Sequence, residues 1–194
     1  SSQAYLVHRV YGLTFDVGNA TREALTRGHG MSDEYSNGNG SLMRILPLAF
    51  TEAGPSDVEA VSSITHAHAT SVEACQLYVD IARRLLKGQQ LSEILSGLGT
   101  SKIYARLQTL AELTEDDIRS TGYVVDTLEA ALWCLLTSTS YLETVLKAVN
   151  LGDDTDTVAA VAGGLAGIIY GLEGIPDNWL SQLRNKELLE SCLF

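Results

Sequence analysis

The chain has 194 residues, of which 45% are hydrophobic and 19% are charged, and its formal net charge is −11. This length and composition are typical of a single folded domain with a buried core. The acidic excess argues against nucleic acid or an anionic membrane as a partner, because no basic patch is present to release counterions. We therefore expect one domain over residues 1–194 that binds neither nucleic acid nor membranes.

The cysteines and the longest apolar run point to the same kind of protein. Cys75, Cys134 and Cys192 are odd in number, widely spaced and set in apolar sequence, which predicts reduced core thiols of a cytoplasmic protein. The apolar run from Val158 to Leu172 is 15 residues long, which is short for a bilayer span. We expect it to be a central buried helix, with Gly163, Gly167 and Gly171 permitting close approach of a neighbouring helix.

The hydrophobic spacing predicts an all-α fold, and no alternating β-branched strand is visible. The clearest amphipathic stretch runs from residue 74 to residue 86, where Leu77, Ile81 and Leu85 share one stripe. A long polar connection, residues 28–41, is of the kind that often carries function. Further helices are expected at 20–27, 41–51, 91–97, 103–112, 125–138 and 178–190, and capping boxes at Ser56–Glu59, Thr70–Glu73 and Ser140–Glu143.

Within the polar connection, Gly38, Asn39 and Gly40 precede Ser41 at the start of an expected helix. Glycine and asparagine readily adopt positive φ, so successive backbone N–H groups can form an anion-binding nest for a phosphate. An ordinary Asn-Gly turn explains the same residues. The spacing matches neither a P-loop nor a dinucleotide-binding fingerprint.

Two histidines, His66 and His68, follow in the run Thr65-His66-Ala67-His68. Residues two apart lie on different sides of a helix, so a zinc pair of the i, i+4 kind is not expected. One histidine could hydrogen-bond a ligand from a helix end, while a structural histidine is the alternative.

The densest acidic run is Gly152-Asp153-Asp154-Thr155-Asp156-Thr157, which leads directly into the apolar stretch. A carboxylate beside a buried helix needs a partner, and a hard divalent cation prefers carboxylate and hydroxyl oxygens. Asp154, Asp156 and Thr157 could converge on one ion at a helix entry. Helix capping is the alternative, since Asp and Thr favour the N-cap.

Taken together, these runs resemble the ADP-ribosylglycohydrolase family, of the dinitrogenase-reductase-activating and ADP-ribosylarginine hydrolase type. The resemblance covers essentially the whole chain, with the motifs in the family's order. The matching residues are Asp16–Arg22, Gly38–Arg44 with Pro47, Thr65–His68, Gly122–Val124, Glu129–Trp133, Ala148–Gly152, Asp154–Ala159, Gly163, Gly167, Tyr170–Gly171, Ile175–Pro176 and Trp179.

The resemblance implies a compact orthogonal helical bundle that binds two Mg²⁺ ions, or Mn²⁺, and cleaves ADP-ribose from a modified side chain. It assigns Asp154 and Asp156 as catalytic and, with Thr157, as metal ligands, and it leaves Asp153 secondary. Arg44 and His68 are expected to be structural. The residues that it assigns to ADP-ribose are Gly38, Asn39, Gly40, Ser41, His66 and Tyr123, the last either against the adenine or in the core.

Family members also carry an upstream segment with a Thr-Asp-Asp run that supplies further metal ligands, and no such run occurs here. We therefore expect an N-terminally incomplete domain, with the upstream segment possible as a separate chain. The expected partner is an ADP-ribosylated protein, arginine being the favoured acceptor, or a small molecule containing ADP-ribose. A catalytically incomplete ADP-ribose-binding module and an inert fragment are the alternatives.

Overall fold

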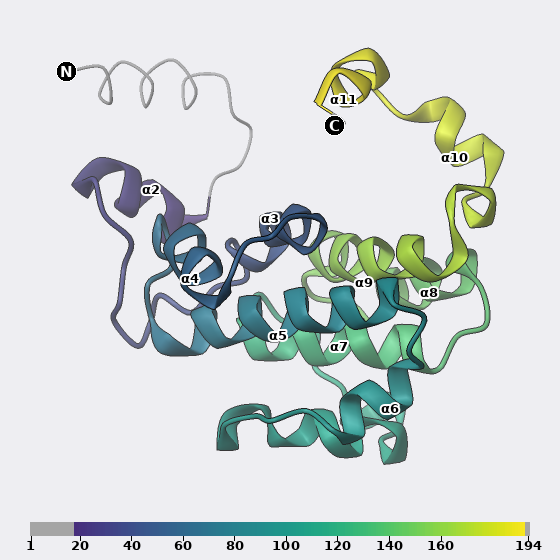
Figure 1. Ribbon diagram of the computed structural model, residues 1–194, viewed down its shortest axis with the longest axis horizontal. Coiled ribbons are helices and arrows are strands. Elements are labelled where there is room, and N and C mark those ends of the chain that lie inside the picture. The colour runs from purple at the N-terminus through teal and green to yellow at the C-terminus, as the bar shows by residue number, and fades with distance from the viewer. Residues whose placement is uncertain (1–17, 193–194) are drawn as a thin grey trace.

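The computed structural model describes residues 18–192, and these residues form helices joined by loops (Figure 1). In this part of the chain β-structure is limited to two isolated bridges, Met31 with His66 and Gly38 with Tyr123. The α-helices are α2 (Asn19–Arg27), α3 (Leu42–Ile45), α4 (Pro55–Ser63), α5 (Ala69–Leu86), α6 (Leu91–Ser96), α7 (Val124–Leu136), α8 (Tyr141–Asn150), α9 (Thr155–Tyr170), α10 (Asp177–Gln182) and α11 (Lys186–Cys192). The 3₁₀ helices are η1 (Leu46–Phe50), η2 (Lys102–Glu112), η3 (Glu115–Asp117) and η4 (Leu172–Gly174).

The all-α expectation is confirmed, and the core lies where α5, α7 and α9 pack together (Figure 1). Helix α5 buries the predicted stripe of Leu77, Ile81 and Leu85. Helix α7 is buried on nearly all sides, which suits its almost wholly apolar sequence. The loops that precede α7 and α9 are therefore anchored on this packed layer of helices.

Helix α9 uses its glycines differently from the prediction. A Cβ on Gly163 would lie 3.3 Å from the Tyr141 hydroxyl of α8, so the close approach expected there is confirmed. A Cβ on Gly167 would meet nothing within 4 Å, and Gly171 instead ends the helix at φ 68°. The closest approach is at Gly164, whose Cβ would lie 2.7 Å from Leu46 Cδ2. This glycine lets α9 approach the segment that follows the Gly-Asn loop.

Helix starts follow the local caps only in part. Ser140 caps α8 as predicted, because its hydroxyl accepts a hydrogen bond from the Glu143 amide at 3.1 Å. The other two capping boxes were predicted two residues too late, because the helices begin earlier in the chain. Helix α4 begins after Gly54, whose amide donates to Asp57, and α5 begins after His68, whose ring accepts from the Thr70 amide. His68 is therefore a helix cap, in agreement with a structural role.

The C-terminal segment forms two short helices instead of the single helix predicted for 178–190. Helix α10 buries no residue, and in Figure 1 α10 and α11 lie away from the main helical body. Asn185, with φ 54°, interrupts the helical path between them.

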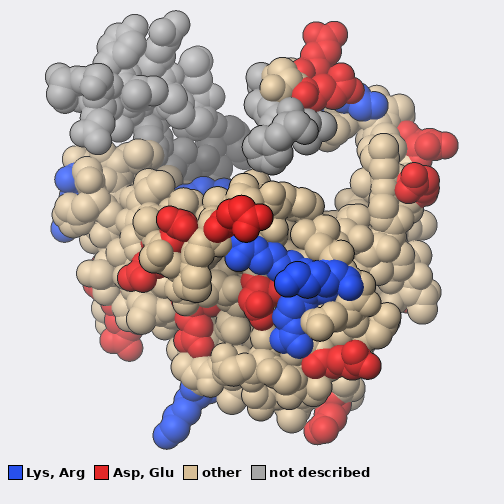
Figure 2. All heavy atoms as spheres, viewed as in Figure 1, with Lys and Arg blue, Asp and Glu red and all other residues tan. Residues whose placement is uncertain are grey.

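Cys75 and Cys134 are buried free thiols, as predicted. The side chain of Cys192 and residues 16 and 17 of the first family motif lie outside the described residues. Between residues 18 and 192, no helix combines the length and apolarity needed to cross a bilayer. Figure 2 shows acidic side chains spread over one face, with a group of basic side chains between them. The absence of a nucleic-acid partner stays a prediction.

An ion pair under α7 yields a testable prediction about stability. Glu129 has an 8% exposed side chain, and its Oε2 lies 3.5 Å from Nε of the half-exposed Arg106. Burial raises the pKa of the Glu129 carboxyl, Arg106 opposes this rise, and Asp126 adds to it. We expect Arg106→Ala to lower the free energy of unfolding by about 1–2 kcal/mol near neutral pH, less than for a fully buried pair because Arg106 is solvated.

The loss should shrink as the pH falls through the folded-state pKa of Glu129, for a reason of proton linkage. A folded-state pKa above the unfolded one means that protonation of Glu129 favours folding. The stability gained from protonation of Glu129 is present at acid pH and is lost as the pH rises through the folded-state pKa of Glu129. Without Arg106 this pKa lies higher still, so the variant loses more stability than the parent at neutral pH. Urea unfolding at several pH values measures it, with Arg106→Ala/Glu129→Gln as control. A loss that is independent of pH would contradict this account.

Candidate functional site

Asn39 joins the Gly-Asn loop to the acidic run. Its side chain is 7% exposed, and Nδ2 donates to Asp154 Oδ2 at 2.6 Å and to Thr127 Oγ1 at 2.9 Å. Its backbone amide donates to the Gly122 carbonyl at 3.1 Å. The prediction that residues 38–41 lie beside the acidic cluster is confirmed at this contact.

The segment 120–123 lies between the loop and the acidic run and is bonded to both. The Asp154 amide donates to the Ser120 carbonyl at 3.0 Å, and the Val124 amide donates to the Asn37 carbonyl at 2.9 Å. A Cβ on Gly122 would lie 3.3 Å from Asp154 Oδ2, so a glycine here leaves room for the carboxylate. Three loops from distant parts of the sequence therefore meet at Asp154.

Asp154 is aimed by the turn that precedes α9. Gly152 and Asp153 have φ values of 92° and 52°, in the left-handed region that glycine and aspartate tolerate. Asp154 occupies the N-cap position of α9, yet its side chain makes no capping hydrogen bond. The capping alternative is therefore wrong for Asp154, whose carboxylate contacts Asn39 instead. Asp153 is exposed, consistent with a secondary place.

Thr157 and Asp156 lie in the first turn of α9. Thr157 is buried, and its Oγ1 lies 3.6 Å from the Met43 sulfur at the start of α3. Asp154 and Thr157 thus both face residues 39–43, whereas Asp156 is exposed. Convergence of all three side chains on one ion stays a prediction.

The oxygen donors of these residues fit the chemistry of a hard cation such as Mg²⁺. Asp154 Oδ2 is held by Asn39, and the carboxylate is not used by the helix. Within residues 18–192, no group of three or more His, Cys, Asp or Glu side chains is arranged to hold a metal ion. Two aspartates and a threonine would not by themselves fill the coordination shell of such an ion, and metal binding by them stays a prediction.

The backbone of the Gly-Asn loop differs from the predicted nest. Gly38, Asn39 and Gly40 all have φ outside the left-handed region, and the Asn39 amide is used by Gly122. The glycine at position 40 is required by packing, because a Cβ there would lie 2.8 Å from His66 Cε1. Ser41 is fully buried, and its hydroxyl accepts a hydrogen bond from the Cys75 thiol. The predicted positive-φ nest is therefore wrong, and binding of ADP-ribose by Gly38–Ser41 stays a prediction.

His66 lies against this loop and is 2% exposed. Burial, with a smaller contribution from the Arg44 cation, lowers its pKa to about 4, so the ring is neutral at physiological pH. Its Nδ1 lies 2.7 Å from Thr65 Oγ1. Arg44 is structural, as expected, but it binds Thr65 and backbone carbonyls rather than a neighbouring acid.

Tyr123 stands at the N-cap of α7 and is 38% exposed, so the core alternative is wrong. Burial of part of the ring, with the charges of Asp126 and Glu34, raises the pKa of its hydroxyl. An exposed ring beside Gly38 is available for stacking, and its contact with adenine stays a prediction.

Two residues of this site were not singled out from the sequence. Thr127 is fully buried and accepts from Asn39, while its hydroxyl lies 2.9 Å from the Thr121 carbonyl. Asn37 accepts from the Ser71 hydroxyl at 3.1 Å through its side chain. A polar threonine inside an otherwise apolar helix was the available signal for Thr127.

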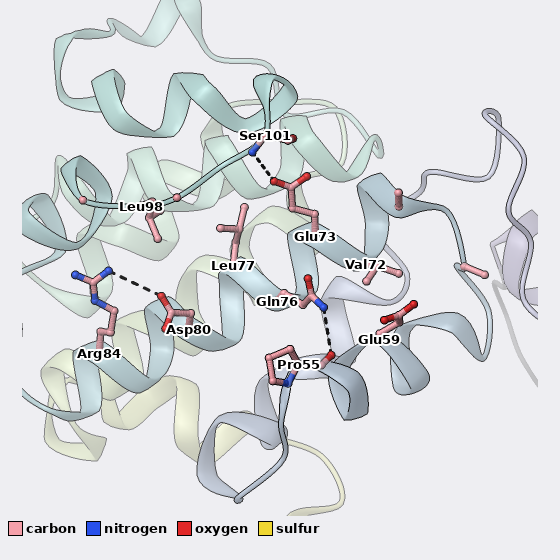
Figure 3. Close-up of a pocket in the computed structure, with 14 residues that line it drawn as sticks. Pro55, Glu59, Val72, Glu73, Gln76, Leu77, Asp80, Arg84, Leu98 and Ser101 are labelled. Atoms are coloured by element: carbon pink, nitrogen blue, oxygen red, sulfur yellow. Dashed lines mark hydrogen bonds and ion pairs between the residues drawn. The ribbon is translucent and has the colours of Figure 1, made fainter.

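A separate groove of about 910 Å³ runs along α4 and α5 and is closed by residues 97–101 (Figure 3). Glu59, Glu73 and Asp80 line it, with Asp80 facing Arg84 and Glu73 accepting from the Ser101 amide. None of the predicted site residues lines this groove. The predicted site residues meet at Asp154 instead, so this groove is not part of the candidate site.

Comparison of the sequence and the fold with known proteins identifies relatives of this chain. The ADP-ribosylglycohydrolase family profile matches residues 2–193. A protein of Pseudomonas putida (strain GB-1) named ADP-ribosylarginine hydrolase Tri1 is 39% identical over an alignment of 190 positions, and the match covers 90% of this chain and 51% of that protein. The ADP-ribosyl-[dinitrogen reductase] glycohydrolase of Rhodospirillum rubrum is 32% identical, covering 88% of this chain and 61% of the relative.

A solved structure titled ADP-ribosylglycohydrolase-related protein complex superposes with a TM-score of 0.75 at 32% identity. The match covers 98% of this chain and 77% of that one. The chain spans about half the length of the curated relatives it matches, 51% and 54% for the two Tri1 proteins. With the profile matching nearly every residue and the same fold in the solved relative, this chain belongs to the ADP-ribosylglycohydrolase family.

Proposed function

We propose that this chain forms part of a Mg²⁺-dependent hydrolase that cleaves the glycosidic bond between ADP-ribose and a modified protein side chain. The observation that carries the proposal is the 2.6 Å hydrogen bond from Asn39 to Asp154, which unites the Gly-Asn loop with the acidic run. Arginine is the favoured acceptor, since the two Tri1 relatives are named ADP-ribosylarginine hydrolases.

In this proposal Asp154, Asp156 and Thr157 hold the metal, and Mn²⁺ can replace Mg²⁺. The metal would supply Lewis-acid chemistry that orients a water and the ribose hydroxyls. Asn39 fixes the Asp154 carboxylate, Tyr123 offers a flat surface to the adenine, and His66 lies behind the loop as a neutral group. The described residues supply only part of two coordination shells, so further ligands are needed.

The proposal is tested by turnover of ADP-ribosylarginine protein with and without a chelator. We expect the 194-residue chain alone to turn over slowly or not at all. Supplying the upstream segment of the family, covalently or as a separate chain, should produce turnover that a chelator abolishes and Mg²⁺ restores. Chelator-resistant turnover, or full activity of the chain alone, would contradict the ligand assignment.

A second candidate is a non-catalytic ADP-ribose-binding module. The observation that favours it is the lack, in residues 18–192, of any three-residue His, Cys, Asp or Glu group suited to a metal. Calorimetric titration with ADP-ribose separates the two. Metal-independent binding without turnover in the complemented protein would support the module.

A further inference from the structure

A continuous chain of side-chain contacts leads from α3 to the ring of His66. Arg44 Nη2 donates to Thr65 Oγ1 at 2.8 Å and to the Val61 carbonyl at 3.2 Å. Thr65 Oγ1 in turn lies 2.7 Å from Nδ1 of His66. Ser62 holds the same segment from the backbone side, because its hydroxyl donates to the His66 carbonyl at 3.0 Å.

The direction of these hydrogen bonds follows from the number of protons available. A guanidinium group can only donate, so Thr65 Oγ1 accepts from Arg44. The threonine hydroxyl has a single proton of its own, and Nδ1 of His66 is the acceptor that the contacts of the described residues place next to it. Accepting from an Nδ1–H through its second lone pair would leave the hydroxyl proton of Thr65 without a partner among these contacts, so the arrangement favours Nδ1 as the acceptor and a neutral ring with its proton on Nε2.

The Nε2 edge of the ring faces the Gly-Asn loop. A Cβ on Gly40 would lie 3.4 Å from Nε2, and a Cβ on Gly38 would lie 3.6 Å from it. Glycines at both positions leave this edge uncovered by side chains of the loop. No hydrogen bond from Nε2 is formed within residues 18–192.

We propose that Arg44 and Thr65 are positioning residues that hold His66 in the Nε2–H tautomer, so that it presents a neutral N–H donor toward the loop of Gly38 and Gly40. The catalytic consequence rests on the proposed function together with the expected assignment of His66 to ADP-ribose, because this donor would then serve an oxygen of that ligand. The tautomer itself is a property of the protein alone and is measured without substrate.

Long-range ¹H–¹⁵N correlation NMR of the ¹⁵N-labelled chain is the decisive experiment. The four histidine rings are assigned by single substitution. We expect His66 near pH 7 to show a protonated-type shift at Nε2 and an unprotonated-type shift at Nδ1. Thr65→Val removes the hydroxyl but keeps the branched shape, and should give mixed or reversed tautomers. Thr65→Ser should restore the wild-type pattern.

Arg44→Met tests the other end of the chain of contacts. The guanidinium of Arg44 turns a lone pair of Thr65 Oγ1 toward itself and so favours a hydroxyl proton directed at Nδ1. Without this donor the hydroxyl can turn, and the Nδ1–H form should become populated. Thermal unfolding of each variant reports whether the fold is kept. If a variant fails to fold, the wild-type spectrum still decides. A wild-type Nδ1–H ring, a charged ring, or a Thr65→Val spectrum identical to wild type would overturn the proposal.

In the complemented enzyme Thr65→Val should raise KM about 3- to 10-fold with a smaller change in kcat, the size expected for one misplaced hydrogen bond, and Thr65→Ser should reverse it. If the enzyme proves inactive on every ADP-ribosylated substrate while the NMR result holds, the proposed function fails and the positioning role stands. An altered tautomer with unchanged KM would overturn the link to the ligand.

Discussion

Asp154→Ala in the complemented enzyme is expected to lower turnover by a factor of about 1000 or more, the scale seen when a group that organises the reacting atoms is lost. The half-buried carboxylate is held by Asn39 and does not cap α9, which supports the proposed role of its oxygens as metal ligands. Asp156→Ala should be comparably damaging if its exposed carboxylate completes the ion's coordination. Initial rates with saturating Mg²⁺ measure both effects.

Asp153→Asn is the matched control, because Asp153 is exposed and asparagine tolerates its φ of 52°. It should keep turnover within about threefold of the parent, given that surface changes usually have small effects. Thermal unfolding of Asp154→Ala excludes simple loss of the fold. Turnover within tenfold of the parent in a folded Asp154→Ala protein would show that Asp154 has no essential role in the reaction. Calorimetric titration of the same variant with Mg²⁺ would then show whether Asp154 is a metal ligand.

Gly30→Ala is expected to produce the largest stability loss among the glycine substitutions in the loop. A Cβ at position 30 would lie 2.0 Å from the Ser63 carbonyl oxygen and 2.9 Å from its carbon, so backbone must move. The next residue, Met31, donates to the Thr65 carbonyl at 3.1 Å and accepts from the Ala67 amide at 2.7 Å. The substitution therefore pushes the loop away from the segment that carries His66. We expect a loss of about 2–3 kcal/mol by urea unfolding.

Gly99→Ala serves as control, because a Cβ there meets nothing within 4 Å and its φ is ordinary. Its free energy of unfolding should change by less than about 1 kcal/mol. A small gain is possible, because alanine reduces the conformational entropy of the unfolded chain. The His66 ring signals should shift in Gly30→Ala and stay unchanged in Gly99→Ala. Equal stability of the two variants would show that the contact at Ser63 is relieved without cost.

Local patterns in the amino-acid sequence account for most of the helices. The stripe of Leu77, Ile81 and Leu85 and the apolar run after Asp156 have the helical period, and both are helices in the structure. Boundaries were less well predicted where several polar residues compete for the cap, as at Thr70, which lies inside α5 after His68. The single helix expected for 178–190 is broken between α10 and α11, where Leu183 is extended and Asn185 has a positive φ, and spacing encodes neither conformation.

For the candidate site, too, the sequence indicated some features and the tertiary structure decided others. Residue chemistry marked Asp154, Asn39 and His66 as candidates but left helix capping, an ordinary turn and a structural histidine open, and the family resemblance assigned them to a site. Folding then brought Asn39 and Asp154 together across 115 positions, a contact that depends on loop closure and on the packing of α3 against α9. Positive φ occurs at Gly152 and Asp153 rather than in the Gly-Asn loop, because the turn into α9 requires it while the glycine at position 40 makes room for His66. The amino-acid sequence by itself therefore determines the helical periodicity. The orientation of each polar side chain depends on the tertiary structure, because it is set by the distant backbone that packs against it.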